Sequence, residues 1–244
     1  IDLTVKSDPE GWAKRLTGVV LPTGGVRLAA FDGGIPSLEG FDEGAWWVQD
    51  AAASIPAKLF GDLSGKRTAD LCAAPGGKTA QLILAGGAVT ALDQSESRLR
   101  RLRSNLDRLS LKAETIAADL TTFEPAERFD AILLDAPCSS TGTTRRHPDV
   151  LWTKGPEDIG RLAALQERLL RHALTLLKPG GTLVFSNCSL DPAEGEDVVA
   201  RVLSDTDAVE RVSIGAGDWP GLEAAITPLS LAAGALGGIV AAVA

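Results

Sequence analysis

Two of the three cysteines in this chain directly follow predicted β-strands. Cys138 follows the apolar run 129–134, and Cys188 follows the apolar run 182–186. The carboxyl ends of neighbouring parallel strands meet at one edge of a sheet, so we expect the two thiols to lie close together. One free cysteine is usually a small buried hydrophobe, whereas two at the same sheet edge favour a nucleophilic role in catalysis.

A glycine-rich turn over residues 72–78 separates a predicted strand over 67–71 from a predicted helix over 79–84. This order builds nucleotide sites in α/β sheets, because glycine lets the backbone approach a ligand and the helix offers unpaired N–H groups. The spacing matches neither G-x-x-x-x-G-K-[ST] nor G-x-G-x-x-G, which indicates an adenosine compound without a pyrophosphate. S-adenosylmethionine fits that description. A turn that only connects two elements is the alternative.

Acidic residues stand at the ends of the following predicted strands. Asp93 lies about twenty residues after the glycine turn, where doubly wound folds place a carboxylate that binds a ribose. Capping of the next helix is the alternative for Asp93, and the two roles are compatible. Asp119 stands at the next strand end, suited to accept a hydrogen bond from an adenine amino group, and Asp135 ends the strand before Cys138.

A methyl donor beside a thiol points to methylation at a carbon that is not nucleophilic by itself, such as C5 of cytosine. A thiolate that adds to C6 makes C5 nucleophilic and divides one difficult step into several easier ones. The thiolate must be available near neutral pH, and a second residue must assist the later cleavage of the C6–S bond. The target base must also leave its stack. The residues alone do not rank Cys138 and Cys188 in these roles.

The elements that position these residues alternate between strands and helices, which implies a mostly parallel sheet with right-handed crossovers. Residues 1–63 are predicted to be a small accessory region, and residues 64–244 the main domain. In the accessory region we expect short strands and turns over 11–28, a helix over 51–60, and a tryptophan pair at 46–47 that belongs to the core or to a wall beside the cofactor. Further predicted strands cover 88–92 and 112–117, and further predicted helices cover 95–109, 159–176 and 194–203, with a stop at 178–181.

The net charge of −8 argues against binding of nucleic acid by bulk electrostatics, so an RNA substrate requires a local basic patch or a further domain. Two candidates are the arginine-rich helix 95–109, where a solvated face is the default interpretation, and the polar basic loop 139–149. We interpret His147 as a loop or phosphate contact rather than a catalytic base. The chain lacks methionine and begins at Ile1, so we expect it to be a fragment.

Cysteine usage and hydropathy argue against a disulfide-bonded, a metal-binding or a membrane-spanning protein. Three scattered cysteines and no signal peptide indicate a reducing cytosol, and no C-x-x-C or Cys/His cluster supports a metal site. The apolar segment 229–244 is shorter than the ~20 residues that a membrane span needs, and we expect it to supply late strands or a tail. We therefore expect a cytoplasmic monomer without a metal.

Four ordered motifs resemble the RNA cytosine-C5 methyltransferase family, in particular its Sun branch of ribosomal-RNA small-subunit methyltransferase B proteins. They are Asp70-Leu71-Cys72-Ala73-Ala74-Pro75-Gly76-Gly77-Lys78, Asp135-Ala136-Pro137-Cys138-Ser139, Arg145-Arg146-His147-Pro148-Asp149, and Asn187-Cys188-Ser189-Leu190 followed by Glu194-Gly195-Glu196.

The resemblance implies a Rossmann-like class I fold with a seven-stranded sheet, and an RNA substrate, ribosomal RNA first and transfer RNA second. It implies that Cys188 is the nucleophile on C6, that Cys138 helps to release the product, and that Asp135 serves both catalysis and cofactor binding. The implied S-adenosylmethionine site comprises Cys72, Ala73, Ala74, Pro75, Gly76, Gly77, Lys78, Asp93, Asp119 and Asp135, to which we add Arg98.

Three departures separate the chain from the family pattern. Asn187 stands where the family usually has Thr, no helical amino-terminal RNA-binding domain is present, and the family's ending is matched only by Gly237-Gly238. Two alternatives stay open: a cofactor-binding RNA-assembly factor without turnover, and a DNA cytosine-C5 methyltransferase with the Pro-Cys thiol as its nucleophile. The sequence does not identify the RNA or the target cytosine.

Overall fold

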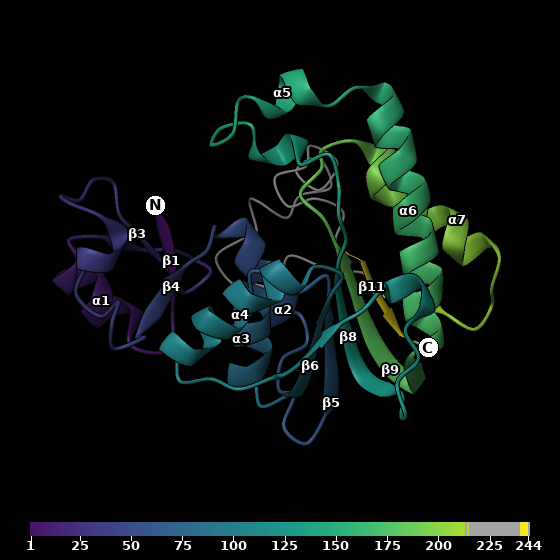
Figure 1. Ribbon diagram of the computed structural model, residues 1–244, viewed down its shortest axis with the longest axis horizontal. Coiled ribbons are helices and arrows are strands. Elements are labelled where there is room, and N and C mark those ends of the chain that lie inside the picture. Colours follow the sequence, from purple (N-terminus) through teal and green to yellow (C-terminus); the bar gives the residue numbers. More distant parts are fainter. Residues whose placement is uncertain (213, 215–239, 244) are drawn as a thin grey trace.

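The computed structural model describes residues 1–212, 214 and 240–243. Its larger sheet has seven strands: β5 (Arg67–Leu71), β6 (Ala88–Asp93), β7 (Glu114–Ala117), β8 (Phe129–Asp135), β9 (Leu177–Ser186), β10 (Glu210–Val212) and β11 (Val240–Val243). Their order is β10-β11-β9-β8-β5-β6-β7 (Figure 1). The five strands from β9 to β7 are parallel, and β11 pairs antiparallel with β9 and β10. The predicted Rossmann-like α/β fold is therefore confirmed.

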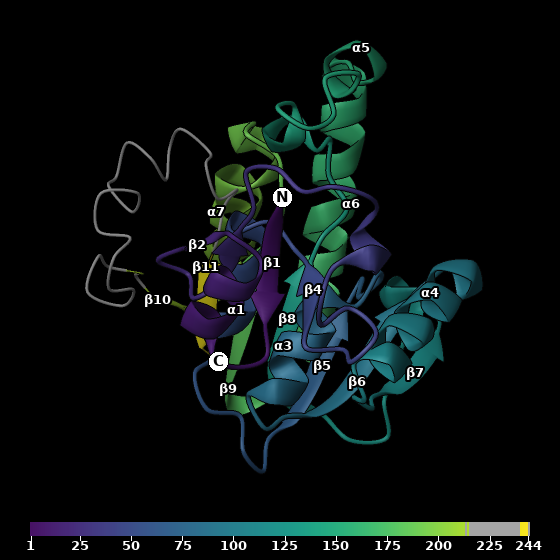
Figure 2. The ribbon, with the colours of Figure 1, turned by 90° about the vertical axis from the view of Figure 1, so that its left-hand side faces the viewer.

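Helices cover both faces of this sheet (Figures 1 and 2). Helices α6 (Pro156–Thr175) and α7 (Glu196–Ser204) lie on one face, and α2 (Ile55–Lys58), α3 (Gly77–Leu84) and α4 (Glu96–Arg108) lie on the other. Successive residues of β8 divide between two cores: Ile132 and Leu134 belong to the α6 side, and Ala131 and Leu133 to the α2 side. A strand buried on both faces is a continuous apolar run, which made β8 readily predictable.

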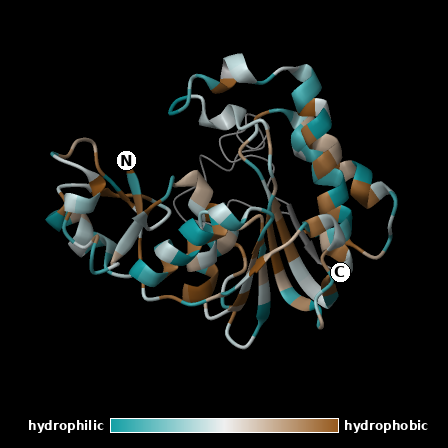
Figure 3. Cartoon of the chain, viewed as in Figure 1, coloured by the Kyte–Doolittle hydropathy of each residue, from teal (hydrophilic) through white to brown (hydrophobic). Residues whose placement is uncertain are grey.

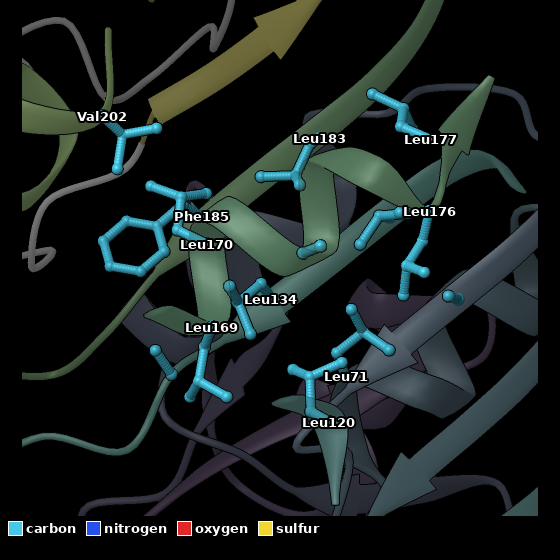
Figure 4. Close-up of a cluster of buried hydrophobic side chains, with 14 of the residues drawn as sticks. Leu71, Leu120, Leu134, Leu169, Leu170, Leu176, Leu177, Leu183, Phe185 and Val202 are labelled. Carbon is cyan, nitrogen blue, oxygen red and sulfur yellow. The ribbon is translucent and has the colours of Figure 1, made fainter. Parts of the chain in front are cut away.

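The core on the α6 side holds more buried side chains than any of the other three clusters of the described residues. Leu183 and Phe185 of β9 pack there with Leu169 and Leu170 of α6 (Figure 4). Each fully buried side chain of this size contributes roughly 1.5–3 kcal/mol of hydrophobic free energy. The hydrophobic colouring of the sheet strands in Figure 3 follows the same core. This packing fixes the β8 and β9 ends, which carry the two predicted catalytic thiols.

The amino-terminal region forms a separate four-stranded antiparallel sheet with the order β2-β3-β1-β4. Its elements are β1 (Asp2–Val5), α1 (Pro9–Arg15), β2 (Val19–Val20), β3 (Val26–Arg27) and β4 (Trp46–Val48). Arg108 of α4 donates hydrogen bonds to the backbone carbonyls of Phe41 and Trp46, and Lys6 donates to the carbonyl of Leu109. These contacts hold the small sheet against α4. We keep 1–63 and 64–244 as the proposed division of the chain.

Two differences from the prediction have a clear local cause. Helix α1 starts at Pro9 and extends into the 11–28 stretch, which was expected to hold only strands and turns. Asp8 caps α1 by accepting a hydrogen bond from Gly11 N, and Pro9 starts the helix. These two local signals outweigh the low helix propensity of Gly11. Strand β9 begins at Leu177 rather than at residue 182. Residues 178–181, which were expected to end the preceding helix, belong to this strand and form an irregularity in its pairing with β8.

The remaining helical elements are short. They are η1 (Ile35–Ser37), η2 (Ala52–Ser54), η3 (Leu120–Thr122), η4 (Thr141–Thr143), α5 (Val150–Thr153) and η5 (Pro192–Glu194). The helix expected over 51–60 is the pair η2 and α2. Of the apolar segment 229–244, residues 240–243 form β11 and the others lie outside the described residues. No helix in the described part of the chain has the length and apolar character to cross a membrane.

Candidate active site

The glycine turn between β5 and α3 is shaped for close backbone approach. Gly76 has φ +101°, and a Cβ there would lie 2.9 Å from Leu102 Cγ. A larger residue at this position would therefore strain the backbone and clash with the Leu102 side chain. A Cβ on Gly77 would lie 3.3 Å from Trp47 Nε1. Helix α3 starts at Gly77 and presents its unpaired N–H groups at this turn.

A cavity of about 360 Å³ lies beside the turn and is lined from several parts of the chain, which include the carboxyl end of α4. The turn residues 72–78 line it together with Asp135, the amino-terminal region contributes Trp47, Gln49 and Asp50, and the loop after β8 contributes Arg146. Trp47 is thus both a core residue and a wall of the cavity, while Trp46 is fully buried in the small sheet's core. Both roles considered for the tryptophan pair therefore occur.

Asp70 places an unpaired oxygen at this cavity. Its Oδ2 accepts a hydrogen bond from Thr79 Oγ1 at 2.5 Å, but Oδ1 is buried without a partner. Burial raises the pKa of Asp70 to about 7, against the opposing hydrogen bond from Thr79 and the charge of Lys78. A buried acceptor without a donor is costly, and a ligand with a cationic or N–H group would supply that donor.

Lys78 and Asp135 form an ion pair across the cavity wall. Lys78 Nζ lies 2.6 Å from Asp135 Oδ2, and Ser186 Oγ donates to Asp135 Oδ1 at 2.8 Å. Burial acts to lower the pKa of Lys78, but the negative charge and hydrogen bond of Asp135 outweigh it and raise the pKa. Lys78 is therefore a fixed cation that orients the Asp135 carboxylate.

The thiols that follow β8 and β9 meet as predicted. Cys138 Sγ and Cys188 Sγ lie 3.4 Å apart, and Ser140 Oγ lies 3.4 Å from Cys188 Sγ. Cys188 is exposed, and Cys138 is half-buried. The Gly142 N–H donates to the Cys188 carbonyl at 2.9 Å, so the backbones of the two loops are also joined.

The two thiols differ in acidity. The hydrogen bond from Cys138 lowers the pKa of Cys188 to about 6, with help from Ser140 and against the effect of burial. The same contact with Cys188, together with burial, raises the pKa of Cys138 far above its ordinary value. Near neutral pH this difference favours the thiolate of Cys188 and the thiol of Cys138, which agrees with the nucleophile role that the resemblance implies for Cys188. Burial raises the pKa of the third cysteine, Cys72, to about 12 and makes it unreactive.

This acidity predicts a pH profile for Cys188 alkylation by iodoacetamide. The pKa lies below its ordinary value, so the thiolate and its reactivity are present above about pH 6 and are lost, about tenfold per unit, as the pH falls further. In Cys138→Ala the hydrogen bond is gone, and the midpoint is expected to move upward. Mass spectrometry of the Cys188 peptide measures both curves. A wild-type midpoint near that of a free thiol would contradict this ranking.

Three predicted cofactor residues do not line the cavity. The Asp93 carboxylate is buried and accepts from Ala74 N at 3.2 Å and Ser95 N at 3.0 Å, and Arg98 pairs with it at 3.3 Å. The helix cap considered for Asp93 is Ser95 instead. Asp119 accepts two hydrogen bonds from Thr121 and caps η3.

Sequence reasoning missed several residues that the fold adds to the site. Gln49 accepts from Thr4 and Trp47 and donates to Gln81, and Asp50 pairs with Arg146 at 3.2 Å. The sequence signal for Gln49 and Asp50 was their position directly after the apolar residues 46–48. We had interpreted these two polar residues only as the approach to the helix expected over 51–60. Asn187 connects the residues around Cys188: its Oδ1 accepts from Ser189 N at 2.9 Å, and its Nδ2 donates to the Glu194 carbonyl.

The doubly wound sheet, the glycine turn and the strand-end carboxylates define an S-adenosylmethionine-dependent methyltransferase fold. The chain belongs to the family described as 16S rRNA methyltransferase RsmB/F, which matches residues 62–230. This confirms the Sun-branch resemblance. Among the described residues, no group of three His, Cys, Asp or Glu side chains is arranged to hold a metal ion.

Individual relatives agree with this family. Ribosomal RNA small subunit methyltransferase B of Vibrio vulnificus is 45% identical over 192 residues, covering 77% of this chain and 45% of that protein. A methyltransferase homolog protein from Pyrococcus horikoshii, solved by crystallography, has 30% identity and a TM-score of 0.77 over 99% of this chain and 84% of its own. NSun6 from the same organism, solved with SFG, has 28% identity and a TM-score of 0.67 over 75% and 49%. The chain spans less than half the length of the curated relatives it matches.

Proposed function

We propose that this chain is the catalytic part of an S-adenosylmethionine-dependent RNA cytosine-C5 methyltransferase that acts on ribosomal RNA through a covalent Cys188–C6 adduct. The observation that carries the proposal is the pair of sulfurs 3.4 Å apart, close enough to Asp135 and Lys78 of the cavity wall for their charges to act on Cys188. One of them is a thiolate and the other a thiol, as addition followed by release requires. The names of the relatives support ribosomal RNA as the substrate.

The residues at the cavity fit S-adenosylmethionine. The glycine turn leaves room for a ligand against the backbone, and Asp70 Oδ1 offers a buried acceptor to an amino group. The bound cofactor would supply the methyl group. Residues 72–78 and Asp135 are proposed to hold it, while Asp93, Arg98 and Asp119 would act from beside the cavity. The SFG in the NSun6 structure supports a cofactor of this class.

The acid–base work is assigned to the protein's own side chains. Cys188 adds to C6 of the extruded cytosine, and Asp135, oriented by Lys78 and Ser186, accepts a hydrogen bond from the cytosine amino group. Once Cys188 is bonded to C6, its negative charge no longer holds up the pKa of Cys138. Cys138 then loses its proton to water more easily. Once C5 carries the methyl group, the Cys138 thiolate takes the C5 proton, the electron pair of that C–H bond re-forms the C5–C6 double bond, and the C6–S bond breaks to return the Cys188 thiolate.

Labelled S-adenosylmethionine tests this function. The chain is incubated with small-subunit ribosomal RNA, transfer RNA or DNA, and the products are digested to nucleosides. Label in 5-methylcytosine from ribosomal RNA is the expected result. Label in another nucleoside, or in DNA alone, would contradict it, and single-turnover assays distinguish a slow enzyme from an assembly factor without turnover.

A projecting segment after η4 is proposed to bind the RNA next to the target. Residues 144–154 reach away from the sheet to α5, where the Trp152 side chain is 89% exposed (Figures 1 and 2). Arg145 and Arg146 are also exposed, and Lys154 follows the helix. An exposed indole among cations suits a stacked, unpaired base beside its phosphates.

Trp152→Ala is expected to raise the KM for RNA about tenfold, because one base–aromatic stack is lost, with little change in kcat. Steady-state methylation over a range of RNA concentrations measures the two constants. Val19→Ala is the matched control, since it removes exposed apolar surface from the small amino-terminal sheet. An unchanged KM in Trp152→Ala would remove the stacking role.

A further inference from the structure

Glu194 is a completely buried carboxylate at the end of η5, between the loops that carry the two thiols. Its Oε1 accepts from Ser139 N at 2.8 Å, and its Oε2 accepts from the hydroxyls of Ser139 and Ser189. Ser139 directly follows Cys138, and Ser189 directly follows Cys188. One side chain therefore bonds to the neighbour of each thiol.

A third element reaches the same carboxylate. Gln166 of α6 donates from Nε2 to Glu194 Oε1 at 3.2 Å and to the Pro137 carbonyl at 2.9 Å. Both partners of this amide nitrogen are acceptors, which fixes the orientation of the Gln166 side chain. The Cys138 loop is thus held on both sides, at Pro137 and at Ser139.

The directions of the hydrogen bonds around Glu194 are mutually consistent. A carboxylate only accepts, so both serine hydroxyls must donate to it. Ser189 Oγ is then free to accept from Asp191 N at 3.1 Å and from Thr141 Oγ1 at 3.3 Å. Thr141 Oγ1 in turn accepts from Leu190 N at 2.8 Å. The network continues from the carboxylate into both chain segments around the thiols.

We propose that Glu194 is a positioning residue that holds the Cys138 and Cys188 loops together, so that the two sulfurs stay within contact distance. The importance of this distance for turnover rests on the proposed function. A buried charge is tolerated only where donors surround it, and those donors lose their partner if it is removed. The Glu194 side chain forms no hydrogen bond with either thiol, and Glu194 does not line the cofactor cavity.

Glu194→Gln tests the proposal, because it keeps the shape but turns one acceptor into a donor that faces other donors. We expect kcat for RNA methylation to fall about a hundredfold, as displacements near 1 Å do, with KM changed less than twofold. Diamide, an azo oxidant, takes two electrons from the sulfur pair, one proton from Cys138 and one proton from water, and is reduced to a hydrazine as the S–S bond forms. The rate of this 138–188 disulfide formation is expected to fall at least tenfold, and the pH midpoint of Cys188 alkylation to rise.

Glu196→Gln is the matched control, since Glu196 is exposed at the start of α7. A purely structural role for Glu194 would lower the melting temperature while leaving disulfide formation, alkylation midpoint and kcat within twofold of wild type, and that result would overturn the proposal. If Glu194→Gln does not fold, Ser139→Ala and Ser189→Ala take its place. Each is expected to slow disulfide formation, and wild-type rates in both would overturn the proposal.

The disulfide and alkylation measurements use the full chain without RNA. If wild type fails to methylate RNA but Glu194→Gln still slows disulfide formation, the proposed function falls and the positioning role stands. If wild type methylates RNA and Glu194→Gln forms the 138–188 disulfide at the wild-type rate, the proposed function stands and the positioning role falls.

Discussion

Cys188→Ala is expected to lower the single-turnover rate of methyl transfer to RNA by roughly 10⁴-fold or more, because it removes the sulfur that is proposed to bond to C6. The Cys188 pKa of about 6 makes this sulfur the available nucleophile at neutral pH, and Cys72 is kept inert by burial. Rapid quenching after mixing RNA and the cofactor with an excess of enzyme over RNA measures this rate.

Cofactor binding separates loss of chemistry from loss of structure in this variant. Cys188 does not line the cofactor cavity, so calorimetric titration with S-adenosylmethionine is expected to give the wild-type affinity. Cys188→Ser keeps the size of the side chain but replaces the acidic thiol by a hydroxyl, and it should be equally inactive. Methyl transfer at the wild-type rate in either variant would eliminate the covalent mechanism.

Cys138→Ala is expected to retain RNA in a covalent complex and to lower turnover by roughly 10²–10⁴-fold, the usual contribution of an acid–base residue. Addition through Cys188 remains possible, whereas removal of the C5 proton lacks its base. After incubation with labelled RNA and S-adenosylmethionine, a denaturing gel should show RNA that migrates with the protein.

Two features make this trapping experiment decisive. The double variant Cys138→Ala, Cys188→Ala should release all RNA on the gel, because the bond is formed by Cys188. A Cys138→Ala enzyme that turns over normally and retains no RNA would assign product release to another group. The raised pKa of Cys138 in the free enzyme agrees with a residue that acts only after Cys188 has been consumed.

Most of the main sheet was predictable because its signals are local. Strand β5 agrees with the predicted range 67–71, and helix α4 agrees within one residue at each end. Continuous apolar runs, glycine turns and leucines at helical spacing are short-range patterns. The amino-terminal region was less predictable, since β1 and β4 consist of few residues and pair across more than forty positions of sequence.

The meeting of the two thiols followed from the same reasoning, because adjacent parallel strands must end at one edge of the sheet. Their difference in acidity did not follow. It depends on a contact of 3.4 Å between the sulfurs and on Ser140, neither of which any spacing in the sequence specifies.

By itself, the sequence predicted the fold and the family and marked two cysteines as candidates for the chemistry, because strand runs, turn glycines and cysteines are read one segment at a time. The folded chain decided which thiol ionises, which walls close the cavity, and that Glu194 joins the two thiol loops. These properties arise from side chains 50 or more positions apart that the fold brings together, so no local pattern encodes them.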